Sequence, residues 1–190
     1  MTSRLASDEL SGSSRPKGQA SVLVGIATHN RASILPIAIR SALAQTHRPL
    51  RVAVIDDGST DSTPELRDEF TSVSWQRWDR AQGYVRARNH MMLSATEKYY
   101  VSLDDDAWFI EGDEIANAIS FMESRASVAV VAFDILHKYR SEKRVRSVDQ
   151  RSRTFIGCGH VLRLSLLSNS ANMQNSRATM VARRRIFLCG

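Results

Sequence analysis

The chain is poor in cysteine and has no long hydrophobic run, and both absences narrow the classes of protein to which it can belong. Its 190 residues include two cysteines, Cys158 and Cys189, whose separation matches neither a zinc site nor a disulfide framework. No uninterrupted apolar run reaches the roughly 18 residues that a transmembrane helix needs, so no transmembrane segment is predicted. This cysteine usage favours a cytoplasmic location, with attachment to the inner face of a membrane left open.

Acidic residues are scarce in the last part of the chain, where residues 136–190 carry 12 Lys or Arg and only 2 Asp or Glu. Residues 21–135 carry 11 Lys or Arg and 16 Asp or Glu, so the excess positive charge lies at the C-terminal end. A basic segment can hold phosphates, but a solvated segment is the simpler explanation. No zinc-finger, RNP or basic-zipper signature is present, so nucleic acid is not an expected partner.

Both ends of the chain are predicted to be disordered. Residues 1–20 are polar, rich in Ser and Gly and without the apolar stretch of a secretion signal, which indicates a disordered leader. Residues 168–190 hold four arginines, no Asp or Glu and one compact apolar run. So little apolar surface cannot offset an ordering cost of about 1–2 kcal/mol per residue, and we predict a basic tail that is disordered or only loosely helical. One domain, residues 21–167, is predicted between the two ends.

Short apolar runs alternate with helical patterns within this domain. The runs begin near residues 21, 51, 73, 98 and 127, which is the rhythm of repeated β–α units. The sequence therefore predicts an α/β fold with a mostly parallel, Rossmann-like sheet flanked by helices. Right-handed crossovers bring the C-terminal ends of parallel strands to one edge, where ligands bind. The expected strands span residues 21–27, 51–56, 73–78, 98–103 and 127–135, and the expected helices span 31–46, 84–96 and 112–124, with another beginning at Pro64.

Polar and charged residues follow the predicted strands at that edge. A carboxylate there can accept hydrogen bonds from a base or from ribose hydroxyls, and a hard divalent cation can bridge carboxylates to a diphosphate. Arg31, together with Arg86 or Arg88, can face phosphates. This combination favours a phosphorylated sugar nucleotide as ligand. The segments concerned are THNR (28–31), DDGS (56–59), AQGYVRAR (81–88) and DDD (104–106).

Each of these segments also has a purely structural explanation. DDGS suits an ordinary turn, and three aspartates can cap the helix that follows them. Thr28 and Asn30 can brace loops through backbone hydrogen bonds. The position of the aspartates directly after strands favours binding in their case. For His29, Arg86 and Arg88, a ligand contact and a plain solvated position remain equal alternatives.

Taken together, four segments closely resemble the nucleotide-binding half of family 2 glycosyltransferases, which have the GT-A fold. They are VGIATHNR, SALAQTHRPLRVAVIDDGSTDST, GYVRARN and VSLDDDAWF, and the resemblance runs from about residue 21 to about residue 165. It implies an inverting transfer of a sugar from a UDP- or GDP-linked donor with Mn²⁺ or Mg²⁺. The donor-binding residues it implies are Thr28, His29, Arg31, Asp57, Arg86, Asp104 and Asp105, and the metal ligands are Asp106 and Asp104.

The resemblance also implies individual roles within this set. His29 stands where the family often places an aromatic ring against the base, and Asp57 stands where a carboxylate reads the base. Asp104 or Asp105 would hold the ribose, while Asp106 would hold the metal ion. The acceptor, which can be a glycan, a lipid or a protein, is not indicated by any of these residues.

The general base expected of this family is missing. Residues 155–167 resemble the Gly-rich segment on the acceptor side, after which family members continue with an acidic pair, but residues 168–190 contain no Asp or Glu. We therefore expect an incomplete acceptor half, with a truncated or frame-shifted C-terminus as the explanation. His160 is the nearest alternative base, and a structural role is favoured for it. The alternatives are an active glycosyltransferase, an inactive nucleotide-sugar binding module or gene remnant, and, least favoured, a nucleic-acid-associated basic protein.

Overall fold

A computed structural model describes residues 20–137, 158–167 and 185–188 of the chain. The predicted leader, residues 1–20, therefore lies outside the described residues except for Ala20. The predicted tail, residues 168–190, lies outside them except for residues 185–188. In the described part of the chain, no helix is long and apolar enough to cross a membrane.

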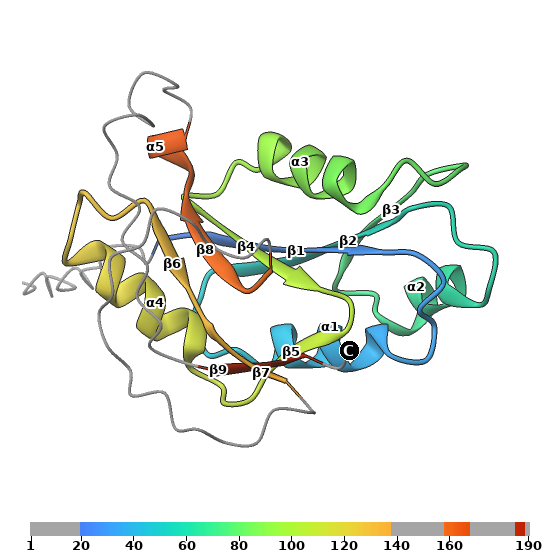
Figure 1. Cartoon of the computed structure of the whole chain (residues 1–190), viewed down its shortest axis with the longest axis horizontal. Coiled ribbons are helices and arrows are strands. Elements are labelled where there is room, and N and C mark those ends of the chain that lie inside the picture. Colours follow the sequence, from blue (N-terminus) through green and yellow to red (C-terminus); the bar gives the residue numbers. More distant parts are fainter. Residues whose placement is uncertain (1–19, 138–157, 168–184, 189–190) are drawn as a thin grey trace, which may run out of the picture.

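The central element is a six-stranded sheet with the order β3-β2-β1-β4-β8-β6 (Figure 1). Strands β1, β2, β3 and β4 pair in parallel, whereas β8 runs antiparallel to both β4 and β6. The predicted α/β class and mostly parallel sheet are confirmed. The strands are β1 (Val22–Thr28), β2 (Leu50–Asp56), β3 (Ser74–Arg77), β4 (Tyr99–Asp104), β6 (Val130–Ala132) and β8 (His160–Arg163).

Helices cover both faces of this sheet (Figure 1). Every residue of β1 is buried, because its alternate side chains pack into two separate clusters. Val22, Val24 and Ile26 pack with α1 and α4, while Leu23 and Ala27 pack with α3. The helical segments are α1 (Leu35–Leu43), η1 (Thr63–Glu65), α2 (Leu66–Glu69), α3 (Tyr84–Ser94), α4 (Glu114–Glu123) and α5 (Leu164–Leu167).

Helix α1 shows why the sequence pattern predicts these helices. Its buried residues recur at helical spacing, at Leu35, Ala38, Ile39 and Ala42, so that one face meets the sheet. Pro36 lies in the first turn, where its missing N–H removes no intrahelical hydrogen bond. The prediction placed this helix correctly, although the structured helix is shorter than the range of 31–46.

A second, three-stranded sheet has the order β5-β9-β7 and consists of β5 (Ala107–Phe109), β9 (Arg185–Leu188) and β7 (Asp134–His137). The predicted strand 127–135 is divided between the two sheets, since the chain breaks its pairing at Phe133, whose N–H bonds the carbonyl of Gly159 at 2.7 Å. Within the predicted tail, residues 185–188 form the strand β9. These four residues find backbone partners on both sides, in β5 and β7, and local composition cannot reveal such partners.

Candidate functional site

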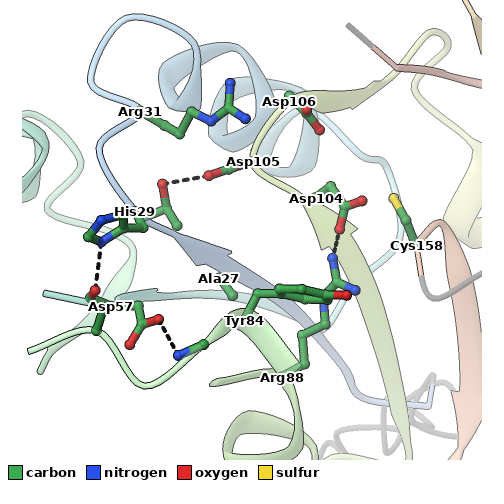
Figure 2. A pocket seen from close by; sticks show the side chains of 13 residues that line it. Ala27, His29, Arg31, Asp57, Tyr84, Arg88, Asp104, Asp105, Asp106 and Cys158 are labelled. Atoms are coloured by element: carbon green, nitrogen blue, oxygen red, sulfur yellow. Dashed lines mark hydrogen bonds and ion pairs between the residues drawn. The ribbon is translucent and has the colours of Figure 1, made fainter. Parts of the chain in front are cut away.

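A cavity of about 660 Å³ opens at the edge of the main sheet where β1, β2 and β4 end (Figure 2). The sequence predicts that Asp57 and the aspartates 104–106 share one pocket, and the structure brings them together there. The lining consists of Ala27, Thr28, His29 and Arg31 from β1 and its loop, Asp57 after β2, Ala81, Gly83, Tyr84 and Arg88 around the start of α3, Asp104, Asp105 and Asp106 at the end of β4, and Cys158 before β8.

The turn after β2 is fastened to the loop after β1 by side chains that alternate along the turn. Ser59, Asp61 and Thr63 accept hydrogen bonds from the backbone N–H groups of residues 30–32, at 2.8, 3.2 and 3.0 Å. Asn30 reciprocates, because its side-chain oxygen accepts from the backbone of residues 60 and 61 at 2.7 and 3.3 Å. The bracing role expected for Asn30 is thus present. Ser59, Asp61 and Thr63 therefore hold the two loops together at the edge of the cavity.

The ring of His29 is held at both of its nitrogens. Nδ1 lies 2.8 Å from the backbone carbonyl of Asp57, which can only accept, so Nδ1 carries the hydrogen. The side-chain amide of Asn30 then donates to Nε2 at 3.1 Å. Because both ring nitrogens are engaged, the ring face is the part of His29 that remains for a flat ligand.

Both carboxylate oxygens of Asp57 bond the loop that precedes α3. Its two oxygens accept from the backbone N–H groups of Gln82 and Gly83, each at 2.7 Å, and the residue is only 4% exposed. The loop also lies directly on Gly58, where a Cβ atom would come within 2.6 Å of the backbone nitrogen of Ala81. Gly58 has a φ of +72°, so the turn requires glycine for both reasons. Asp57 can still bind a ligand through its remaining lone pairs.

The three aspartates at the end of β4 diverge rather than point at one spot (Figure 2). The hydroxyl of Thr28 donates to Asp105 at 2.8 Å, and burial raises the pKa of the Asp105 carboxyl. Asp104 forms an ion pair with Arg88. Asp106 is half-buried in the lining. Among the described residues, no group of three or more His, Cys, Asp or Glu side chains is arranged to hold a metal ion.

The family model described as "Glycosyl transferase family 2" matches residues 23–178. The chain belongs to glycosyl transferase family 2. An uncharacterized glycosyltransferase of Rickettsia felis is 36% identical over 104 residues, which are 54% of this chain but only 17% of that relative's length.

Solved structures show the fold of this family 2 chain. S. aureus TarS 1-349 in complex with UDP-GlcNAc matches with a TM-score of 0.72 at 14% identity, over 90% of this chain and 58% of TarS 1-349. The mannosyltransferase PcManGT from Pyrobaculum calidifontis, in complex with GDP-Man and Mn²⁺, matches with a TM-score of 0.72 at 19% identity, over 92% and 57% of the two chains. The family 2 chain thus has the GT-A fold that its sequence predicts.

Most of the donor-site residues predicted for this family 2 chain line the cavity, but Arg86 does not. Tyr84 and Arg88 stand four residues apart on the face of α3 that borders the cavity, whereas Ala87 and Met91 pack into the core. Arg86 lies on neither face and is exposed. Of the two alternatives, Arg86 and Arg88, the structure therefore places Arg88 at the pocket.

Tyr84 and Cys158 line the cavity but were not predicted as site residues. Helical spacing could have indicated Tyr84, because it precedes Arg88 by one turn of α3. Cys158 had no such signal, since it reaches the pocket only through the pairing of β8 with β4. Burial raises the pKa of its thiol to about 12, so this side chain stays protonated and uncharged. His160 is buried in β8 and is not part of the lining, in keeping with a structural role.

Proposed function

We propose that this family 2 domain binds a nucleotide-diphosphate sugar in the cavity and supplies the donor side of an inverting, metal-dependent sugar transfer. The observation that carries the proposal is the convergence of Asp57, the aspartates 104–106 and two arginines on one cavity at the C-terminal edge of a parallel sheet. An acidic and arginine-containing pocket suits a ligand that offers hydroxyl donors, a diphosphate and a bound cation together.

The two ends of the pocket suit different parts of such a donor. At one end, the free ring face of His29 and the remaining lone pairs of Asp57 suit a planar base with an N–H donor. Arg31 and Arg88 are the lining groups that can bond a diphosphate. At the other end, Cys158 offers a small, uncharged wall beside the aspartates, where the sugar would lie. TarS and PcManGT are described with UDP-GlcNAc and GDP-Man, so a uracil and a guanine base are both candidates.

The side chains present fit a divalent cation that is shared with the donor. Their ligand atoms are carboxylate oxygens, which hard cations prefer, and Mg²⁺ is commonly held by one or two carboxylates together with substrate phosphates. Asp106 would hold the ion, with Asp104 as the second ligand. When bound, the cation would offset the negative charge that develops on the departing nucleoside diphosphate. Arg88 and Thr28, which bond Asp104 and Asp105, would help to orient the carboxylates around the donor.

Transfer to an acceptor needs a group that removes the proton of the attacking hydroxyl. His160, the alternative base considered from the sequence, is buried and does not line the cavity. This observation favours a second candidate function, the binding of a nucleotide sugar without transfer. The acceptor can be a glycan, a lipid or a protein. A nucleic-acid partner is disfavoured, because the cavity lining has four carboxylates and only two arginines.

Calorimetric titration of the protein with UDP and with GDP, each with and without Mn²⁺, tests the donor site. We expect one of the two nucleotides to bind, with an affinity that rises with Mn²⁺. Asp106→Asn should lower the Mn²⁺-dependent gain in nucleotide affinity by about tenfold or more. Even the hydrogen-bond partners of metal ligands typically change metal affinity by that factor. Asp68→Asn, an exposed change on α2, is the matched control and should have no effect. Absence of binding by both nucleotides would refute the donor site.

Consumption of the donor separates transfer from binding alone. Release of nucleoside diphosphate from UDP-glucose, UDP-GlcNAc or GDP-mannose is measured by mass spectrometry after incubation with Mn²⁺ and candidate acceptors. Turnover that Asp106→Asn abolishes supports the transferase. Tight binding with no turnover for any acceptor supports the binding module.

A further inference from the structure

Arg88 and Asp104 form an ion pair inside the cavity, at one of the two positions where a metal ligand is predicted. The two side chains are only 19% and 23% exposed, so water screens their attraction incompletely. A positive group is therefore already paired with the Asp104 carboxylate that a cation would need. We propose that Arg88 is a positioning residue that competes with the divalent cation for Asp104, and that it turns to the donor's diphosphate once the cation has displaced it.

The structure holds the Arg88 guanidinium in a defined place between α3 and β4. Its central carbon lies 4.8 Å from the centroid of the Tyr84 ring, one helical turn earlier (Figure 2). The start of α3 is itself fixed, because Asp57 accepts the backbone N–H of Gly83 at 2.7 Å. A guanidinium placed in this way keeps Asp104 turned away from Asp106 while the pocket is without donor.

The charge balance of the pocket explains why this competition would matter. The lining has four carboxylates, Asp57, Asp104, Asp105 and Asp106, against the guanidinium groups of Arg31 and Arg88. An anionic diphosphate that enters this pocket meets an excess of negative charge. If a cation takes Asp104, Arg88 is released within the same pocket and can bond the phosphates instead. One positive group thus serves two anions in turn, and cation and donor each favour the binding of the other.

The first test uses Mn²⁺ alone, without nucleotide, and measures free Mn²⁺ by electron paramagnetic resonance. Arg88→Met should bind Mn²⁺ more tightly than the wild type by about fivefold, the upper range for a partly screened ion pair. Arg88→Lys, which keeps the charge, should stay near the wild type. Arg40→Met removes the same charge from an exposed ion pair with Glu69, outside the cavity, and should change nothing. A structural defect would weaken Mn²⁺ binding and could not strengthen it.

The increase in Mn²⁺ affinity of Arg88→Met must also depend on Asp104. In an Asp104→Asn background, Arg88→Met should no longer raise the Mn²⁺ affinity, since the group for which the two cations compete is gone. The proposal is overturned if Arg88→Met fails to bind Mn²⁺ more tightly than the wild type, which includes the case in which neither binds Mn²⁺. It is also overturned if the gain persists without Asp104.

The second test concerns the diphosphate and rests on the proposed function. With saturating Mn²⁺, Arg88→Met should weaken UDP or GDP binding by about tenfold while leaving the binding of the matching nucleoside unchanged, because only the diphosphate bonds Arg88. An equal loss for nucleoside and diphosphate would overturn the second half of the proposal. If the wild type binds no nucleotide at all, the proposed function fails, whereas the Mn²⁺ experiment still decides the competition for Asp104.

Discussion

At the scale of single residues, Asp57 shows how a side chain that looks like a ligand contact can first be a structural tie. The sequence resemblance implies that its carboxylate reads the base. In the structure, both of its oxygens accept backbone N–H groups from the loop that leads into α3. That loop carries Ala81 and Gly83, which line the cavity, and Tyr84 follows at once. Asp57 therefore shapes the pocket wall even before any ligand is bound.

Asp57→Asn tests this role, because an amide can accept only one of the two N–H groups and turns its own N–H toward the other. A hydrogen bond to a charged group contributes roughly 1.5–3 kcal/mol, so we expect nucleotide affinity to fall by about tenfold or more. Amide hydrogen exchange at residues 82–84 should become faster at the same time. Asp68→Asn serves again as control. Unchanged exchange at residues 82–84 would mean that Asp57 does not hold the loop.

At the scale of elements, a buried polar network joins the end of α1 to the start of α4. The Gln45 amide donates to the Glu114 carboxylate at 2.7 Å and to the carbonyl of Glu111 at 3.1 Å, and its oxygen accepts the N–H of Ile115 at 3.0 Å. Gln45 and Glu114 are 0% and 1% exposed. The network fixes the two helices that pack together on one face of the sheet. It explains structurally why a glutamine stands in the QT segment of the family resemblance.

The same network predicts a pH dependence of stability. Burial raises the pKa of Glu114 above its ordinary value of 4.5, despite the hydrogen bond from Gln45. The folded state therefore holds this proton more tightly than the unfolded state. The contribution of Glu114 to the free energy of unfolding should be largest below about pH 4.5. It should fall as the pH rises through the raised pKa of Glu114.

Urea unfolding of the wild type and Glu114→Gln from pH 4 to pH 8 measures this contribution. The difference between the two proteins isolates Glu114 from the other carboxyls, because they titrate in both. We expect the free energy of unfolding to decline less with rising pH in Glu114→Gln than in the wild type. A constant difference in the free energy of unfolding across the range would contradict the raised pKa.

At the scale of the whole molecule, the strand β9 links the far end of the chain to the acidic turn. It pairs antiparallel with β5, which begins directly after Asp106, and parallel with β7. Residues 185–188 lie beyond the range 23–178 that the family model matches. The small sheet next to the pocket is thus completed by a segment outside the family match.

Deletion of residues 185–190, compared with deletion of residues 189–190 alone, tests this arrangement. Without β9, the backbone groups of β5 and β7 lose their partners, so amide exchange at residues 107–109 and 134–137 should speed up by about tenfold or more, the factor that roughly one hydrogen bond contributes. The main sheet should keep its protection. Equal exchange at residues 107–109 in the two deletions would show that β9 does not support β5.

The elements with a local sequence pattern are those that could be predicted from the amino-acid sequence. The apolar runs of β1, β2 and β4 are continuous because both faces of those strands are covered, and the spacing of Leu35, Ala38 and Ile39 marks α1 because a helix repeats every 3.6 residues. From parallel strands alone it followed that Asp57 and the aspartates 104–106 would meet at one edge, and they do. The family resemblance rests on these same local segments.

Contacts between residues far apart in the chain depend instead on how the strands and helices pack. The pairing of β8 with β4 brings Cys158 to the pocket, and that of β9 with β5 depends on backbone partners some 80 residues away, which no local pattern encodes. The choice of Arg88 over Arg86 depends on the rotation of α3 against the core. The pairing of Asp104 with Arg88 likewise depends on where α3 lies beside β4. Local spacing can list candidate side chains, but packing between elements decides which of them face one another.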